Sequence, residues 1–267
     1  MPSPPLSSEA AKLIWFESHG CRLFAVESGE GAPLIYLHGG LANHFATRHL
    51  IGALRGRVRA ITPDLRGSGK SVHAADIDWQ VLADDVVSLA NHLGLHRVVV
   101  GGVSFGSGVA LATALQHPDR VAGLVIVSPM YRGTERGLTP AQCAVLEKMN
   151  AFGSRVPTEG LQALDPLFAP LPSDVRQRVA DAVRSFDPAS VAATTKFLAS
   201  EVQPFGSLDE LTSIRAPALI VAGNDPQHPR EIADLYAQNL PTCAIHPAVD
   251  SDFADAIVEM CARATGA

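Results

Sequence analysis

A serine between two glycines follows directly on an apolar run, and this junction constrains the fold more than any other feature. The run Val98–Gly101 is typical of a buried strand, and the sequence Gly-Val-Ser-Phe-Gly occupies residues 102–106. A strand that turns sharply into a helix needs small residues on both sides of the turn, because a Cβ there would collide with neighbouring backbone. Residues 107–116 are alanine-rich and predict a buried helix. The sequence therefore predicts a strand, a sharp turn with Ser104 at its tip, and a helix.

Three further segments also place a short motif at the end of a predicted strand or beside one. A predicted strand at Pro33–Leu37 ends in His-Gly-Gly-Leu at 38–41, a second segment spans Ile61–Ser71, and a late strand runs into Asp225 within Ala218–Pro226. Together with the Ser104 turn, these three segments resemble motifs of the α/β-hydrolase superfamily and occur in the same order. The resemblance covers most of the chain. The resemblance implies an α/β fold with a mostly parallel eight-stranded sheet flanked by helices.

Alternation of short apolar runs with longer amphipathic stretches gives the expected elements. We expect strands at Leu13–Glu17, Leu23–Glu27, Pro33–Leu37, Arg59–Thr62, Val98–Gly101, Leu124–Ser128, Ala218–Ala222 and Thr242–His246. We expect helices at Thr47–Leu54, Trp79–Leu93, Ser107–Gln116, Pro140–Phe152, Pro157–Ala163, Asp174–Ser185, Pro188–Ser200, Pro229–Asn239 and Ala254–Ala264. Strand signals are missing between the sixth and seventh strands. This predicts a hydrolase core over 1–128 and 217–267, and a helical cap over 129–216 inserted after the sixth strand.

Composition excludes several classes of function. The 267 residues carry 21 Lys and Arg against 27 Asp and Glu, a net charge of -6, without a basic cluster that could neutralise phosphates. Residues 1–11 lack the features of a leader, and no run approaches the ~18 apolar residues that span a bilayer. The four cysteines are widely spaced, which argues against a metal site. We expect a cytoplasmic protein with no cofactor, metal, membrane or nucleic-acid partner. We expect its substrate to be a small apolar organic molecule, and a homodimer is a possible assembly.

A serine nucleophile needs a base within hydrogen-bond reach and donors aimed at the developing oxyanion. Phe105 begins the predicted helix, so its N–H points to the oxyanion position. The resemblance assigns the second N–H to Gly40, with Leu41 as the alternative, and gives His38 a supporting role in the loop. Asp225 is the expected acid of a catalytic triad. The competing interpretation is that Asp225 caps the helix that starts near Pro229.

The base is missing from its usual place. In the superfamily the catalytic histidine lies in the loop after the last strand, and here residues 247–253 contain no histidine. Three histidines remain as candidates: His228, three residues after Asp225; His246, at the end of the last strand; and His44, just past the oxyanion loop. We expect His228 to be the base because it adjoins the acid, in a position that lines the pocket in this superfamily.

The expected activity is that of a serine hydrolase acting on an ester, lactone, thioester or carbon–carbon bond of a small apolar substrate, with Ser104, His228 and Asp225 as the catalytic residues. The alternatives are a non-hydrolytic reaction on the same fold (lyase, cyclase or isomerase type) and ligand binding without chemistry. Substrate contacts are expected from Leu41, His44, Met130 and Tyr131. Apolar cap residues that would form a ceiling over the substrate include Leu146, Met149, Phe152, Leu167, Phe168 and Phe197.

Overall fold

The computed structural model describes residues 11–54, 56–71, 77–170, 172–184 and 186–265. Residues 1–10, on which the expectation about a leader depends, lie outside the described residues, and so does Ser185, where one expected helix ends. Within the described ranges, no helix is both long enough and apolar enough to cross a membrane.

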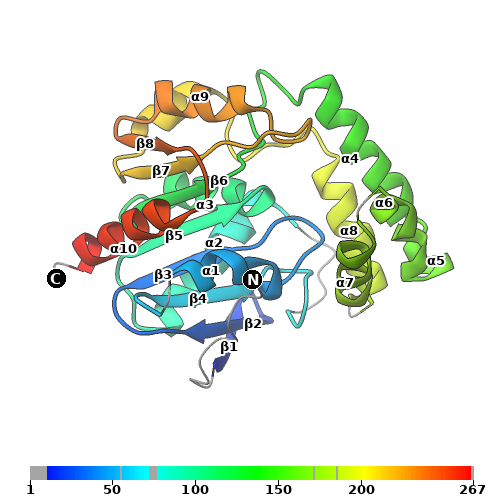
Figure 1. Cartoon of the computed structure of the whole chain (residues 1–267), viewed down its shortest axis with the longest axis horizontal. Helices are drawn as coiled ribbons and strands as arrows, with labels where there is room; N and C mark the ends of the chain where they lie inside the picture. The colour runs from blue at the N-terminus through cyan, green and yellow to red at the C-terminus, as the bar shows by residue number, and fades with distance from the viewer. Residues whose placement is uncertain (1–10, 55, 72–76, 171, 185, 266–267) are drawn as a thin grey trace.

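Eight strands of the described chain form one sheet in the order β1-β2-β4-β3-β5-β6-β7-β8 (Figure 1). Their bounds are Lys12–Ser18, Cys21–Ser28, Pro33–Leu37, Arg59–Asp64, Val98–Val103, Val121–Val127, Ala218–Val221 and Cys243–His246 for β1 to β8. The two pairs that contain β2 are antiparallel, and every pair from β4 to β8 along the sheet is parallel. The expected mostly parallel, eight-stranded sheet is confirmed.

Alternating side chains of the central strands belong to two hydrophobic cores, one on each face of the sheet. On β5, Val98 and Val100 join one buried cluster and Val99 joins the other, as the two-residue period of a strand requires. The first face is covered by α2 (Trp79–His92), α3 (Phe105–Gln116) and α9 (Arg230–Asn239), and the second by α1 (Arg48–Ala53) and α10 (Ser251–Thr265) (Figure 1). Because both faces of the sheet are buried there, the central strands β3, β5, β6 and β7 are apolar throughout.

A group of helices stands to one side of the sheet, between β6 and β7 in the chain (Figure 1). We call these elements the inserted helices; they are α4 Pro140–Gly153, α5 Val156–Glu159, η2 Leu161–Leu164, α6 Asp165–Phe168, α7 Ser173–Val183 and α8 Pro188–Leu198, where η marks a 3-10 helix. The short helix η3 Leu208–Ser213 follows them in the chain but packs against α9 in the core of the first face. The expected helix over Pro157–Ala163 is wrong: Gly160 has a φ of +81°, which ends α5 and starts η2. A left-handed residue of this kind cannot continue a right-handed helix.

The topology brings the expected site residues to one edge of the sheet. Strands β3, β5, β6 and β7 are parallel neighbours in that order, so the loops that leave their carboxyl ends meet. The loop after β3 carries Gly40, the turn after β5 carries Ser104, the segment after β6 carries Met130, and the loop after β7 carries Asp225 and His228.

Candidate active site

The turn after β5 holds Ser104 in a strained backbone conformation. Its φ is +54° and its ψ is -117°, a region that residues with a side chain rarely occupy. A Cβ on Gly102 would lie 2.3 Å from the Gly106 carbonyl carbon, and a Cβ on Gly106 would lie 2.5 Å from the His38 carbonyl oxygen. Both glycines are therefore required by close backbone contact, as the sequence predicts. The helix α3 begins at Phe105, directly after Ser104 and two residues before the alanine-rich stretch 107–116.

The imidazole of His228 lies between the serine and a carboxylate. Its Nε2 is 2.7 Å from the Ser104 Oγ, and its Nδ1 is 3.0 Å from each carboxylate oxygen of Asp225. An ionised carboxylate only accepts hydrogen bonds, so Nδ1 carries the proton and Nε2 is left to accept the serine hydroxyl. The geometry is that of a nucleophile, a base and an orienting acid.

A tight turn allows His228 and Asp225 to share one loop. The His228 N–H donates to the Asp225 carbonyl over 3.0 Å, which closes a four-residue turn with Pro226 in second place, and proline favours that position. The Asp225 carboxylate also accepts the Gln227 N–H at 2.8 Å and the His228 N–H at 2.9 Å. The chain then folds back over Gly223, where a Cβ would lie only 2.3 Å from the His228 Cβ. Only glycine at 223 lets the histidine return to the serine.

Asp225 does not cap the following helix, so that interpretation is wrong. The helix α9 begins at Arg230 after Pro229, and no side chain accepts a hydrogen bond at its N-cap. Partial burial acts to raise the pKa of Asp225, but the hydrogen bonds and charge of His228 and the Gln227 N–H outweigh it, so this pKa lies below its ordinary value. The carboxylate thus stays ionised beside the imidazole, although its side chain is 53% exposed.

The loop after β3 lies against the serine turn. A Cβ on Gly39 would be 3.6 Å from the Ser104 Cβ, and one on Gly40 would be 2.7 Å from a methyl carbon of Leu198 in α8. The buried His38 ring spans this loop: Nδ1 donates to the Gly39 carbonyl over 2.7 Å, and Nε2 accepts the Leu65 N–H over 3.0 Å. Burial lowers the pKa of His38, which outweighs the opposing hydrogen bond to Gly39. A neutral His38 therefore holds the loop in place.

The N–H of Phe105 belongs to the first turn of α3, where backbone N–H groups have no partner within the helix. Such a group at a helix N-terminus favours negative charge. Gly40 lies in the loop that packs against the Ser104 turn, and Phe105 is the first residue of α3, directly after Ser104.

The structure places the other two candidate histidines away from the serine. The His44 Nδ1 lies 2.7 Å from Asp64, a buried carboxylate that also accepts the His44 N–H. His246 ends β8, is partly exposed, and packs on Phe253 of α10 with ring centroids 5.2 Å apart. Phe253 belongs to the core on the opposite face of the sheet from α3. No contact between either ring and Ser104 is found among the described residues.

The expected substrate contacts divide into two groups. The Met130 sulfur lies 3.7 Å from the Ser104 Oγ. Leu41 lines a small hollow beside the loop that follows β3. Tyr131 instead packs edge-on against Trp79 within the core and is buried. His44 is held by Asp64, as described above. Of the four expected residues, Met130 is the one with a contact to the Ser104 hydroxyl.

Gln142 on α4 was not singled out from the sequence. It is fully buried, and its Nε2 donates to the Met130 carbonyl over 2.7 Å and to the Gln227 carbonyl over 2.8 Å, while its Oε1 accepts the Thr139 N–H. Gln142 therefore connects Met130, whose sulfur lies near Ser104, to the turn that carries His228. The visible signal, Thr-x-x-Gln before a helix, indicates a capping box, which is present, but says nothing of these distant contacts.

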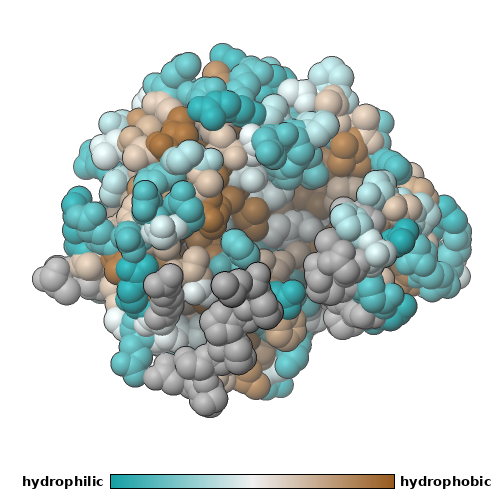
Figure 2. All heavy atoms as spheres, viewed as in Figure 1, coloured by the Kyte–Doolittle hydropathy of each residue, from teal (hydrophilic) through white to brown (hydrophobic). Residues whose placement is uncertain are grey.

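The site offers nothing for a metal ion: in the described ranges, no three His, Cys, Asp or Glu side chains are grouped closely enough to hold one. The surface is hollowed where the inserted helices meet the rest of the molecule, and hydrophobic residues are visible around this recess (Figure 2). What the arrangement can do is activate a serine hydroxyl and stabilise an oxyanion beside apolar walls.

The fold and this constellation define a class of protein, and comparison with known families agrees. Residues 32–242 match the family model described as alpha/beta hydrolase fold. The chain therefore belongs to the α/β-hydrolase family, as the resemblance of its motifs implies. The match ends before β8 and before the loop that lacks a histidine.

Among curated proteins, the chain is 34% identical over 114 residues to haloalkane dehalogenase 2 of Mycobacterium tuberculosis, which is 42% of this chain and 40% of that protein. It is 35% identical over 132 residues to 2-hydroxymuconate semialdehyde hydrolase of a Pseudomonas species, 48% of this chain and 46% of that one. The chain thus spans less than half the length of these relatives. Among solved structures, a thermophilic esterase of Thermogutta terrifontis superposes with a TM-score of 0.76 at 25% identity, over 95% of this chain and 99% of that one.

Proposed function

We propose that this protein is a serine hydrolase in which Ser104 is the nucleophile, His228 the general base and Asp225 the acid that orients it. The N–H groups of Gly40 and Phe105 are the oxyanion donors. The observation that carries the proposal is the distance of 2.7 Å between the Ser104 Oγ and the His228 Nε2, with Asp225 on the opposite ring nitrogen.

The proposed reaction proceeds through an acyl-enzyme. The Ser104 oxygen attacks the substrate carbonyl carbon while its proton passes to the His228 Nε2, and the oxyanion that forms is held by the two N–H donors. Collapse of the intermediate breaks the scissile bond, and His228 returns the proton to the leaving group. Water then attacks the acyl-enzyme with His228 again as base, which releases the acid and restores the serine. Asp225 keeps its charge throughout and stabilises the imidazolium.

The substrate class we propose is an ester, lactone, thioester or activated carbon–carbon bond in a small apolar molecule. Support comes from the Met130 sulfur beside the nucleophile and from the hydrophobic recess between the inserted helices and the body (Figure 2). We also propose that residues 129–216 form the cap over residues 1–128 and 217–267. The names of the relatives, an esterase and a semialdehyde hydrolase among them, agree with hydrolysis of small organic molecules.

The test is reaction with a fluorophosphonate and with short-chain p-nitrophenyl esters. A phosphonate forms a covalent bond only with an activated serine, so mass spectrometry should find the adduct on Ser104 and none in Ser104→Ala. The same variant should lose ester turnover while keeping the wild-type unfolding temperature. A wild-type protein that neither hydrolyses these esters nor takes the label would contradict the proposal and favour a non-hydrolytic reaction or ligand binding.

A further inference from the structure

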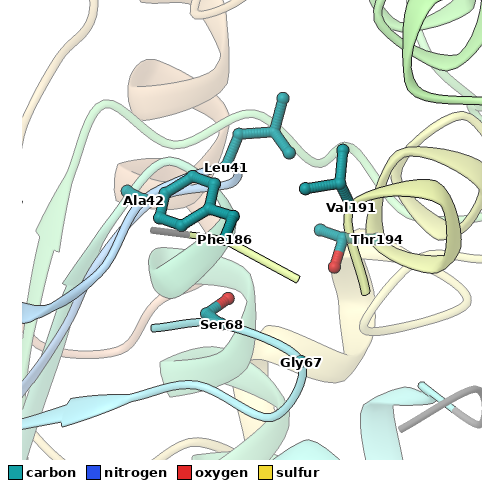
Figure 3. Close-up of a pocket in the computed structure, with 7 residues that line it drawn as sticks. All are labelled: Leu41, Ala42, Gly67, Ser68, Phe186, Val191 and Thr194. Carbon is teal, nitrogen blue, oxygen red and sulfur yellow. The ribbon is translucent and has the colours of Figure 1, made fainter. Parts of the chain in front are cut away.

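A small hollow opens beside the oxyanion loop, where three segments of the chain meet (Figure 3). It encloses about 200 Å³ of space between its lining atoms, its open mouth included. The part of this space that is enclosed measures about 10 Å³, about the room that one water molecule or one oxygen-sized group needs, so the hollow can take only the tip of a substrate chain. Its lining comes from the oxyanion loop, the loop after β4 and the inserted helices: Leu41, Ala42, Gly67, Ser68, Phe186, Val191 and Thr194.

The hollow contains a buried hydroxyl that lacks a partner. Thr194 is 5% exposed, and its Oγ1 makes no hydrogen bond with any described residue. Its neighbour Thr195 shows the usual solution in a helix, because its hydroxyl donates to the Val191 carbonyl one turn earlier. Thr194 instead directs its hydroxyl toward the space that the Ser68 hydroxyl also faces (Figure 3). Buried polar groups are nearly always hydrogen-bonded in native proteins, so the Thr194 hydroxyl indicates a missing partner, and the partly exposed Ser68 hydroxyl faces the same space.

The hollow adjoins the proposed reaction centre. Leu41 follows Gly40 directly and lines the hollow. On α8, Leu198 lies against Gly40, and Thr194 stands one turn earlier on the same face, about 6 Å along the helix axis. A substrate whose carbonyl oxygen is held by the Gly40 and Phe105 N–H groups can therefore extend its adjoining chain by a few atoms to reach the two hydroxyls.

Charge limits what can bind there. No Asp, Glu, Lys, Arg or His is among the residues that line the hollow. A carboxylate or ammonium placed there would lose its hydration without a counter-ion, which is strongly unfavourable, whereas a neutral oxygen needs only one or two hydrogen bonds. Apart from the hydroxyls, the walls are mostly aliphatic and aromatic.

We propose that this hollow is an acyl-chain subsite in which Ser68 and Thr194 bind a neutral oxygen, as in a keto or ether group, a few atoms from the scissile carbonyl. The inference rests on the proposed function and narrows its substrate class to oxygenated, uncharged acyl chains. A site built to hydrogen-bond such an oxygen discriminates against the hydrocarbon analogue, because the hydroxyls then stay unpaired.

The experiment compares kcat/KM for p-nitrophenyl 4-oxopentanoate and p-nitrophenyl pentanoate, which share a leaving group and differ by one oxygen in the acyl chain. We expect the wild type to prefer the oxo ester about fivefold to tenfold, the value of one or two hydrogen bonds. Thr194→Val, which keeps the shape of the side chain, should bring this ratio close to one. Thr194→Ser should preserve the ratio because it retains the hydroxyl, and Thr195→Val is the matched control that should leave the ratio unchanged.

Different failures are distinguishable. If the wild type hydrolyses both esters at Ser104 without a preference, or if Thr194→Val keeps the preference, the subsite is wrong and the proposed function stands; a water molecule would then be the partner of Thr194. A second pair, pentyl and 2-ethoxyethyl butyrate, places the oxygen in the alcohol. A preference found only in that pair would assign the hollow to the leaving group and overturn the proposal. Hydrolysis of no ester, with no label on Ser104, would overturn the proposed function and the subsite together.

Discussion

Replacing Gln142 by leucine should reduce turnover far more than substrate binding, although Gln142 does not touch Ser104 in the described structure. The leucine keeps most of the side-chain volume but removes both hydrogen bonds from Nε2, to the Met130 carbonyl and to the Gln227 carbonyl. The turn that carries His228 then loses its attachment to α4.

The structure gives the expected magnitudes. The Met130 carbonyl is fully buried, and a buried acceptor left without a donor costs about 1–3 kcal/mol, so we expect a loss of about 2 kcal/mol in the free energy of unfolding. Gln227 is partly exposed, so its carbonyl can turn to water, and His228 would move with it. Because a misplacement of about 1 Å can cost a hundredfold in rate, kcat should fall about tenfold to a hundredfold, with KM within about threefold.

Stopped-flow ester kinetics and urea unfolding measure the two effects separately. The matched control is Tyr236→Phe, which also leaves one buried carbonyl, that of Tyr131, without its hydrogen bond but has no part in the His228 turn. This control should lose stability and keep kcat. A folded Gln142→Leu protein with wild-type kcat, or a control with the same loss of kcat, would refute the argument that Gln142 positions the base.

Three further predictions concern the scaffold. Gly102→Ala should abolish phosphonate labelling of Ser104, because its Cβ would meet the Gly106 carbonyl carbon at 2.3 Å; a variant labelled at the wild-type rate would show that the turn can relax. His246→Ala should lower the unfolding temperature through lost packing on Phe253 and leave ester hydrolysis unchanged; a large loss of kcat in this variant would reopen the choice of base. Burial acts to raise the pKa of Asp64, but the hydrogen bonds from His44 and Lys70 together outweigh it, so this pKa lies below its ordinary value. Its charge therefore stabilises the fold above the unfolded pKa of about 3.9, and this stability is lost as the pH falls through the lower folded pKa. Asp64→Asn should flatten that acid limb in urea unfolding followed against pH, and an unchanged slope would exclude Asp64 as its source.

The turn at Ser104 is predictable because its requirements are local. Two glycines, an apolar strand before them and an alanine-rich helix after them all lie within 20 residues, and the close contacts at Gly102 and Gly106 confirm the reason for each glycine. The closeness of Asp225 and His228, the proposed acid and base, is predictable for a similar reason. Asp-Pro-Gln-His is a compact turn, so a histidine three residues after the aspartate is brought back beside it.

Other parts of the site depend on contacts that no local pattern encodes. Gln142 meets the Gln227 carbonyl across 85 positions of the chain, and its sequence context indicates only a helix start. Thr194 and Ser68 come from segments that lie side by side only because α8 folds over the loop after β4. The break at Gly160 within the expected helix Pro157–Ala163 is also not predictable, since a single glycine in an otherwise helical pattern can be tolerated or can end the helix.

Whether His228 activates Ser104 is seen in the rate at which a phosphonate adds to this serine. Intact-protein mass spectrometry should give a rapid second-order rate for the wild type, a rate lower by about a thousandfold or more for His228→Ala, and a near-wild-type rate for His246→Ala. Asp225→Asn should also be slow, because the ring then loses the carboxylate that fixes its tautomer. A His228→Ala protein that is labelled as fast as the wild type would contradict the account.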